Sequence, residues 1–517
     1  MTGVLAQSGG KMKNDQSKLA GALNSLRELQ KEGRSVFRSS EFSRLQRERL
    51  LRQGYLVGVM RGWLLSSNPG ADAEDTTPWY SSFWEFIAAY CENRWGEAWH
   101  LAPEASLLLH VEEWAIPQQL LVHSPKAGNN PVDLPFQSSL LAVKPTRKTA
   151  GQEVRIVRGL RLLPAEDALA RLPQSCFRTR SREIQTALAT LVDIPRLLRI
   201  VLENGQPIVA GRLAAALRHL GRNDDADEIV GTMRSAGHDT REVNPFRDAQ
   251  EPVSRGLRAS PLSSRLEGFW LAMREDVLNH FPAPRGRHPD IAARLQQVNE
   301  RYSMDAYHSL SIEGYRVSDE LIEKVRSGNW DPDAADKGSR DAMAAKGYAL
   351  AFSALRSSLE RILQGEDAVA VTRLEHRTWY RELFAPSVAA GLVEARDLAG
   401  YRSEAVFIRK SRHVPPRAML LPEAMGTYFD LLESEPSPAV QAVLSHWLLG
   451  YIHPYLDGNG RMARFLMNVM FVAGGYPWLV IHTRDRDEYM AALESASVHC
   501  DIVPFARFLG ARMFADE

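Results

Sequence analysis

The amino-acid sequence predicts a multidomain, mainly α-helical protein with an α+β region towards its N-terminal end. Its 517 residues are enough for roughly three domains of about 150 residues each. From Arg265 onwards, apolar residues recur almost without interruption at the spacing of amphipathic helices. Before residue 170, by contrast, helical segments alternate with short apolar runs that are typical of strands.

The composition excludes several broad classes of function. Lys and Arg together number 63, as do Asp and Glu, so no whole-chain charge favours nucleic acid or membranes. The three cysteines lie far apart without Cys-x-x-Cys spacing, which is typical of a reducing compartment and argues against structural zinc. No apolar run reaches membrane-spanning length, and residues 1–14 lack the apolar core of a signal peptide. We therefore expect a cytoplasmic protein without a membrane partner.

Residues 18–70 are predicted to form a small module with the outline of a winged helix. The polar residues 1–17 before it are expected to be a disordered tail. Leucines along one helical face predict an amphipathic helix that begins at Leu19 and ends at Gly33. Three further elements are expected after it: a helix over 43–53 and two short strands, 55–59 and 61–65.

This module is locally basic, although the whole chain is neutral. Between residues 25 and 65 there are nine Lys and Arg residues against four Glu residues. Because phosphate neutralisation supplies much of the affinity of DNA-binding proteins, a basic helix beside a strand pair predicts binding to duplex DNA. Winged helices also serve as protein-docking modules, in which case the arginines form a solvated face. Both interpretations stay open.

The region 71–245 is predicted to be α+β at first and helical towards its end. A helix rich in aromatic residues is expected over 79–99, and helical periodicity covers 183–235. Strand-like runs lie between them, at 107–110, 119–122 and 154–157. The polar segment 244–255 is the expected domain boundary. This order of elements, with the phrase Leu51-Arg52-Gln53-Gly54-Tyr55-Leu56, resembles the antitoxins of AbiE-type systems and implies a toxin–antitoxin context.

The C-terminal half is predicted to be almost entirely helical. Helices are expected at 265–280, 289–313, 318–327, 338–364, 371–383, 420–433, 438–451, 461–474 and 486–497. The exception is segment 400–416, where alternating apolar and polar residues between Gly400 and Pro415-Pro416 predict a small β-hairpin.

One short run carries most of the chemistry: His453-Pro454-Tyr455-Leu456-Asp457-Gly458-Asn459-Gly460-Arg461-Met462-Ala463-Arg464. It joins two predicted helices, and a glycine-rich loop that opens a helix is an anion site because free N–H groups and the helix dipole face the ligand. Arg461 and Arg464 share one face of the second helix, where both can reach one polyphosphate. The run lacks the ligand spacing of a calcium loop and the Gly-Lys-Ser/Thr of a Walker A loop.

This run resembles the signature of Fic-domain proteins, with Tyr455 in place of the usual Phe. Segment 400–416 is similar to the flap of that family, and Arg486-Asp487-Glu488-Tyr489 is similar to one of its closing helices. The resemblance covers about 300–512, so we expect an all-α Fic domain with a β-hairpin flap over 256–517. It implies transfer of AMP from ATP to a Ser, Thr or Tyr hydroxyl of a protein.

The resemblance also implies a role for each residue of the site. His453, whose ordinary pKa is near neutrality, would take the proton from the attacking hydroxyl. Asp457 would bind Mg²⁺, and Gly458, Asn459 and Gly460 would offer donors to the phosphates. The remaining nucleotide contacts are expected from Arg461 and Arg464, from the flap residues Val406, Phe407 and Ile408, and from Tyr489. Doc-type kinases of this fold carry Lys at the position of Gly460, which favours nucleotidyl transfer here.

A second motif, Ser309-Leu310-Ser311-Ile312-Glu313-Gly314, resembles the inhibitory helix of the same family, expected over about 304–313. Ser309 and Glu313 share a helix face, and Glu313 lies at the C-terminal end, where the helix dipole disfavours a negative charge. The resemblance implies that Arg464 compensates this charge and is thereby removed from the γ-phosphate. The alternative is a capped helix with an incidental surface Glu.

Two functions therefore follow from the sequence. The first is an autoinhibited protein adenylyltransferase that modifies a protein hydroxyl, its own included, and is compatible with a homodimer. The second is a regulator that binds duplex DNA through residues 18–70 and uses the Fic fold as a nucleotide sensor. Transfer of a different nucleoside monophosphate is a further alternative, because the motif does not encode the choice of base.

Overall fold

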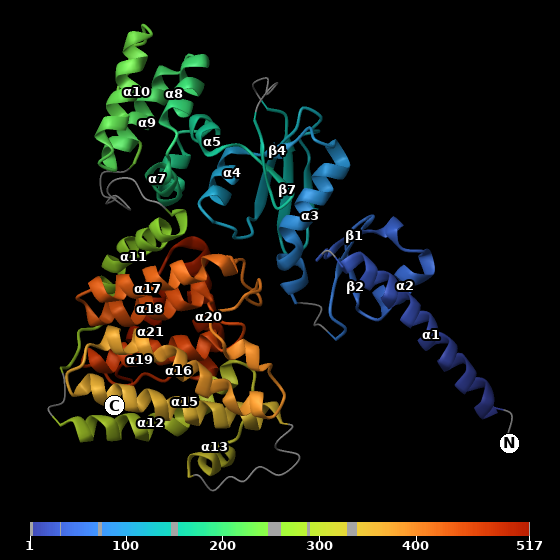
Figure 1. The fold of residues 1–517 in the computed structure, drawn as a ribbon, viewed down its shortest axis with the longest axis vertical. Coiled ribbons are helices and arrows are strands. Elements are labelled where there is room, and N and C mark those ends of the chain that lie inside the picture. Colours follow the sequence, from blue (N-terminus) through green and yellow to red (C-terminus); the bar gives the residue numbers. More distant parts are fainter. Residues whose placement is uncertain are drawn as a thin grey trace. The chain divides into compact units, whose positions relative to one another are not determined.

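The chain divides into two compact units in the computed structural model (Figure 1). The first unit comprises Met1–Cys176, Asp193–Val209 and Phe407–Val414, and the second comprises Phe177–Val192, Ala210–Val406 and Pro415–Glu517. The structure describes residues 4–31, 33–70, 75–145, 153–246, 260–286, 290–327 and 339–515. Within this part of the chain, no helix combines the length and apolar content that crossing a bilayer requires.

The first unit begins with a module of two helices and a three-stranded antiparallel sheet. Its elements are α1 (Val4–Gln30), β1 (Val36–Arg38), α2 (Arg44–Arg52), β2 (Leu56–Met60) and β3 (Trp63–Ser66), and the strand order is β1-β3-β2. The Ser43 hydroxyl caps α2 by accepting from Gln46 N, and the Gln46 side-chain oxygen accepts from Ser43 N. The predicted helix and strand pair are confirmed.

The expected tail over 1–17 differs from the structure, because the backbone is helical from Val4. No proline interrupts this stretch, and each residue added to a formed helix gains one further hydrogen bond. The core of the module gathers residues from every element: Leu26, Phe37, Leu50, Leu56 and Leu64 are all buried.

A second sheet follows in the first unit, with α3 and α4 contributing to the same core (Figure 1). Its elements are α3 (Thr77–Trp95), β4 (His100–Leu101), α4 (Pro103–His110), β5 (Gln119–His123), β6 (Pro131–Leu134) and β7 (Ser138–Val143). The strand order is β4-β5-β7-β6, with β5 and β7 parallel, and β8 (Arg155–Val157) and β9 (Leu160–Leu162) form a separate hairpin. The strands predicted at 119–122 and 154–157 are confirmed.

The strand predicted at 107–110 is wrong, because these residues are the end of α4. Pro103 at the first helical position favours a helix start, and Leu107 and Leu109 are buried from within the helix. A short apolar run does not by its periodicity distinguish a strand from a buried helix.

Short helices then alternate between the two units. They are α5 (Ala165–Arg171), α6 (Cys176–Thr179), α7 (Ser181–Thr190), α8 (Ile194–Glu203), α9 (Pro207–His219) and α10 (Asn223–Ser235). The helices predicted over 183–235 are confirmed. The limits of the two compact units do not coincide with the predicted boundaries at 17, 70 and 245. Residues 247–259 lie outside the described residues. The domain boundaries therefore stay predictions.

The second unit is built around one apolar core formed by its long helices. These are α11 (Pro261–His280), α12 (Ile291–Ile312), α13 (Asp319–Arg326), α15 (Arg340–Leu363), α16 (Ala368–Ala389), α17 (Leu421–Ser434), α18 (Pro438–Ile452), α19 (Asn459–Ala473), α20 (Arg486–His499) and α21 (Val503–Arg512). In Figure 1, α19 lies among its packing partners α15, α16 and α18. All residues of α19 except Gly460 are buried, as expected for a helix packed on every side.

The β-hairpin predicted over 400–416 is not present, since the structure describes this whole segment without a strand. Lys410 turns the chain with a left-handed φ of 64°, and Pro415 and Pro416 have no N–H for a ladder. Phe407–Val414 instead belongs to the first unit, where Lys410 N donates to Thr76 Oγ1 at 3.1 Å. An isolated hairpin is only marginally stable, and Phe407–Val414 bonds within the first unit instead of pairing as strands.

Candidate functional site

A tight loop joins α18 to α19, as the sequence predicts. His453 ends α18 with a left-handed φ of 51°, and Gly458 precedes α19 with a φ of 81°. Asn459 closes the loop, because its Oδ1 accepts from Tyr455 N at 2.9 Å and its Nδ2 donates to Tyr455 O at 2.8 Å. The Asn459 amide therefore shapes the loop, and its predicted contact with a phosphate stays a prediction.

Aromatic rings form the floor beneath this loop. The buried Tyr455 ring stacks on Tyr380, with 3.8 Å between the ring centroids. A Cβ at Gly458 would lie 2.7 Å from the Phe384 ring, and the left-handed backbone disfavours a side chain there as well. The loop conformation is thus specified by packing from α16 as well as by its own glycine.

His453 is placed as a neutral base. Its Nδ1 bonds to Gly450 O at 3.2 Å, and because a carbonyl only accepts, Nδ1 carries the hydrogen and Nε2 is left basic. Burial lowers the pKa of the imidazole to about 4, the Gly450 bond opposes this shift, and the nearby Arg402 guanidinium adds to it. The ring is therefore uncharged at neutral pH.

Arg402 holds the backbone around the histidine and was not identified from the sequence. The buried guanidinium donates from Nε to His453 O at 2.8 Å and from Nη2 to Pro416 O at 2.6 Å. Burial lowers its pKa to about 10. Its sequence neighbours carry no signal for this role, because both partners lie far along the chain.

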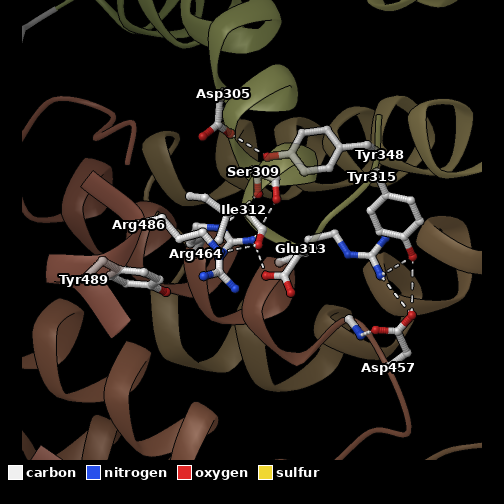
Figure 2. A network of polar contacts seen from close by, with 12 residues as sticks. Asp305, Ser309, Ile312, Glu313, Tyr315, Tyr348, Asp457, Arg464, Arg486 and Tyr489 are labelled. Atoms are coloured by element: carbon white, nitrogen blue, oxygen red, sulfur yellow. Dashed lines mark hydrogen bonds and ion pairs between the residues drawn. The ribbon is translucent and has the colours of Figure 1, made fainter. Parts of the chain in front are cut away.

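Arg464 is buried on α19 and faces the end of α12 (Figure 2). Its Nη2 lies 2.7 Å from Glu313 Oε1, and its Nε donates to Ser309 Oγ at 2.8 Å. The Glu313 carboxylate raises the pKa of the guanidinium, although burial opposes this. The structure thus brings together the three residues that the sequence singled out for an inhibitory contact.

The local backbone explains why Glu313 reaches this arginine. Helix α12 ends at Ile312, Gly314 takes a left-handed φ of 87°, and Arg486 Nε donates to Ile312 O at 3.0 Å. Gly460 leaves room for the carboxylate, since a Cβ there would collide with Glu313 Oε1. Both glycines therefore permit the Glu313–Arg464 ion pair.

Arg461 points to the other side of the loop, towards Asp457 and Tyr315. Its Nη2 lies 3.5 Å from Asp457 Oδ2, and its guanidinium lies over the Tyr315 ring at 5.0 Å and the Phe384 ring at 4.9 Å. Asp457 is half-exposed and its Oδ1 accepts from Gly458 N at 2.6 Å. Among the described residues, no group of three or more His, Cys, Asp or Glu side chains could hold a metal by itself.

Two buried polar pairs lie behind Arg464. Tyr489 shares a hydrogen bond of 2.9 Å with His446 Nε2, and burial raises the pKa of the Tyr489 phenol. On the other side, Tyr348 donates to Asp305 at 2.6 Å, and burial raises the pKa of this carboxyl to about 6. Asp305 was missed from the sequence, although it lies one turn before Ser309 on the same helix face.

The flap residues are divided between the two units. Val406 belongs to the second unit, whereas Phe407 and Ile408 belong to the first, and all three are half-buried. The structure therefore brings together Ser309, Glu313, His453, Asp457 to Gly460, Arg461, Arg464 and Tyr489 in one unit. The predicted contacts of the flap with a nucleotide stay predictions.

Comparisons with known proteins identify relatives of this chain. Residues 372–471 match the model of the Fic/DOC family. The chain is 28% identical over 334 residues to the protein adenylyltransferase Fic of Nematostella vectensis, covering 59% of this chain and 74% of that protein. It is 31% identical over 227 residues to the protein adenylyltransferase Fic of Drosophila willistoni, covering 43% of this chain and 42% of that protein.

The chain thus has homologues among Fic protein adenylyltransferases, and it spans less than half the length of the Drosophila relative. The solved structure of Fic-1 (residues 134–508) from C. elegans covers 68% of this chain and 94% of its own, at 19% identity and a TM-score of 0.36. A TM-score this low supports no further conclusion.

Proposed function

We propose that this protein is an adenylyltransferase that transfers AMP from ATP to a Ser, Thr or Tyr hydroxyl of a protein. The observation that carries the proposal is the α18–α19 loop, which combines a neutral histidine with two buried arginines from one helix. The Fic/DOC match over 372–471 includes every one of these residues. The resemblance to characterised adenylyltransferases supplies the nucleotide and the acceptor class.

The reaction follows from the positions of these groups. The acceptor oxygen attacks the α-phosphorus while its proton passes to His453 Nε2, and the bond from the α-phosphorus to the bridging oxygen breaks to release pyrophosphate. The backbone N–H groups at the start of α19, with Arg461 and Arg464, stabilise the charge on the phosphates. Catalysis is therefore mostly positioning and electrostatic stabilisation around an in-line displacement.

The residues fit a magnesium ion only together with the triphosphate. Asp457 offers one half-exposed carboxylate, and magnesium commonly takes one or two carboxylates with substrate phosphates and water. When bound, the ion would neutralise charge on the leaving pyrophosphate. Asp457 would hold it and Arg461 would fix the Asp457 carboxylate, since these two side chains are already paired.

The geometry also supports self-inhibition. Ser309 accepts from Nε of the Arg464 guanidinium and Glu313 accepts from its Nη2, so these two donors are not free to bind the γ-phosphate. Ion pairs with charge-assisted hydrogen bonds are among the stronger polar contacts, and this one is half-buried on the Glu313 side. The protein is then an enzyme whose resting state binds ATP poorly or in an unproductive position.

The position of the isotopic label in ATP tests the proposed reaction. With ATP labelled at the α-phosphorus, we expect incorporation into protein by the Glu313→Gly variant, whereas label at the γ-phosphorus should remain in pyrophosphate. We expect AMP transfer rather than phosphorylation because residue 460 is Gly, whereas Doc-type kinases of this fold carry Lys at this position. Incorporation of γ-label alone would instead indicate a kinase, and the absence of either label across a panel of cell proteins would refute the transfer reaction.

A second candidate function concerns residues 18–70, for which we propose binding to duplex DNA. The order helix, strand, helix and strand pair supports the winged-helix interpretation. On α2, Arg44 and Arg52 are exposed and Arg47 and Arg49 are half-buried. We expect the full chain to bind a labelled duplex with an affinity that falls steeply with salt. Neutralising these four arginines should abolish the binding. Fluorescence anisotropy that shows no binding at low salt would exclude DNA, leaving the protein-docking interpretation.

A further inference from the structure

We infer that Tyr315 is a second inhibitory group, which holds Asp457 and Arg461 while Glu313 holds Arg464. The inference rests on the proposed function, because it concerns the groups assigned to magnesium and phosphate. It extends the inhibitory contact from one arginine to both, and from the phosphate side of the site to the cation side.

The hydroxyl of Tyr315 bridges the two groups (Figure 2). It donates to Asp457 Oδ2 at 3.4 Å and accepts from Arg461 Nη2 at 3.4 Å. Both bonds are long, so each is individually weak. The bond to Asp457 uses the same carboxylate oxygen that pairs with Arg461 Nη2 at 3.5 Å.

The aromatic ring adds contacts to two guanidinium groups. Arg461 lies over the Tyr315 ring at 5.0 Å, and Arg340 lies over it at 4.9 Å. Tyr315 is 7% exposed and Arg461 is buried, so their contact is shielded from solvent, and cation–π attraction is stronger when the groups are desolvated. The Arg340 side chain is largely exposed. Arg340 also approaches Asp457 Oδ2 at 4.0 Å, which completes a cluster around this carboxylate.

The backbone fixes this arrangement to the end of the inhibitory helix. Tyr315 N donates to Leu310 O at 3.1 Å and Gly314 N donates to Ser311 O at 3.0 Å, so the turn after α12 is closed by its own hydrogen bonds. Glu313 and Tyr315 therefore emerge from one rigid turn and reach opposite sides of the α19 N-terminus. Removing the Glu313 side chain would leave this turn, and Tyr315, in place.

A functional consequence follows from the chemistry of Asp457. A hydroxyl that donates to Oδ2 occupies a lone pair that a cation would need, and a ring beneath Arg461 competes with a phosphate for its charge. Full activation then requires two releases: Arg464 from Glu313, and the Asp457–Arg461 pair from Tyr315. The second release should depend on magnesium, whereas the first should not.

The test measures binding of a non-hydrolysable ATP analogue by isothermal titration calorimetry on the full chain, with magnesium and with EDTA. Tyr315→Phe removes only the hydroxyl, and we expect it to tighten binding about 3- to 10-fold with magnesium in both the wild-type and Glu313→Gly backgrounds. The gain should be smaller in EDTA and in an Asp457→Asn background, where only the lost bond to Arg461 contributes. Tyr307→Phe changes a half-buried tyrosine of α12 and is the control, which should leave the affinity for the analogue unchanged.

Each outcome decides one point. If Glu313→Gly binds the analogue but Tyr315→Phe leaves its affinity unchanged or weaker, Tyr315 is a structural residue and the inference is wrong. A gain of equal size in EDTA also overturns it, because the hydroxyl then does not act through the cation ligand. If no variant binds the analogue, the proposed function itself fails.

Tyr315→Leu provides a second variant, because it removes the aromatic ring as well as the hydroxyl. It should show a magnesium-independent gain in affinity through Arg461.

Discussion

Replacing Glu313 with Gly should raise the rate of AMP incorporation by about 10- to 100-fold, the factor expected when a hydrogen-bonded charged group loses about 1.5 to 3 kcal/mol of competing interaction. The Arg464 guanidinium is buried and keeps its contacts to Ser309, so it stays in position and gains a vacant direction for the γ-phosphate. Initial rates with α-labelled ATP measure the change.

Two further variants separate release of Arg464 from other effects of the substitution. Glu313→Gln keeps the shape but removes the charge, so it should activate less than Glu313→Gly. Gly460→Ala acts from the other side, since its Cβ would collide with the Glu313 carboxylate. It should tighten nucleotide binding in the wild-type background and give no further gain once Glu313 is removed.

Glu300→Gly provides the matched control on the same helix, because Glu300 is exposed and bonds only locally to Gln296. It should not activate. Equal activation by both glycine variants would show that loosening α12, rather than freeing Arg464, raises the rate.

The sequence predicted the parts of this site that short motifs and helical periodicity encode. The loop at 453–458, the helices on either side of it and the helix end at Glu313 were all recognisable, because each depends on neighbours within a few turns. The pairing of Glu313 with Arg464 joins residues 151 positions apart, and it came from the family resemblance rather than from spacing.

Other parts could not be predicted, and the reasons are physical. Arg402 and Tyr315 act through partners 51 and 142 residues away, and nothing in their own surroundings marks them. Nothing in the sequence indicated that the Asn459 side chain bonds to Tyr455 N and Tyr455 O, and its contact with a phosphate stays a prediction. The segment 400–416 alternates like a strand, but Phe407–Val414 bonds within the first unit, to Thr76 and Ile116, which no local pattern indicates.

His453→Ala, made in the Glu313→Gly background, should lower the rate of AMP transfer by about 10²- to 10⁴-fold, the usual contribution of a positioned general base. The only proton acceptor that faces away from the helix in this ring is Nε2, because Nδ1 is engaged by Gly450 O. Affinity for the ATP analogue should be nearly unchanged, since in the proposed function α19 holds the phosphates. Loss of analogue binding in parallel with the rate would indicate a disrupted loop rather than a lost base.

The lowered pKa of His453 gives this prediction a second readout in its dependence on pH. The folded pKa is about 4 and the ordinary value is 6.5, so the activated enzyme should keep its base unprotonated down to about pH 5. The acid limb of the pH–rate profile should therefore lie well below 6.5. Protonation of His453 also affects stability. The unfolded chain binds the proton more readily than the folded chain, so the free energy of unfolding decreases as pH falls from 6.5 towards 4.

The alanine variant lacks this group and should lose less stability over the same interval, as measured by melting temperature against pH. His499→Ala removes an exposed histidine of α20 and is the matched control for both readouts. A rate profile for the parent enzyme that falls near pH 6.5 would contradict a base held neutral by burial. A profile shifted to lower pH, together with a loss of rate that leaves nucleotide binding intact, assigns the proton transfer to His453.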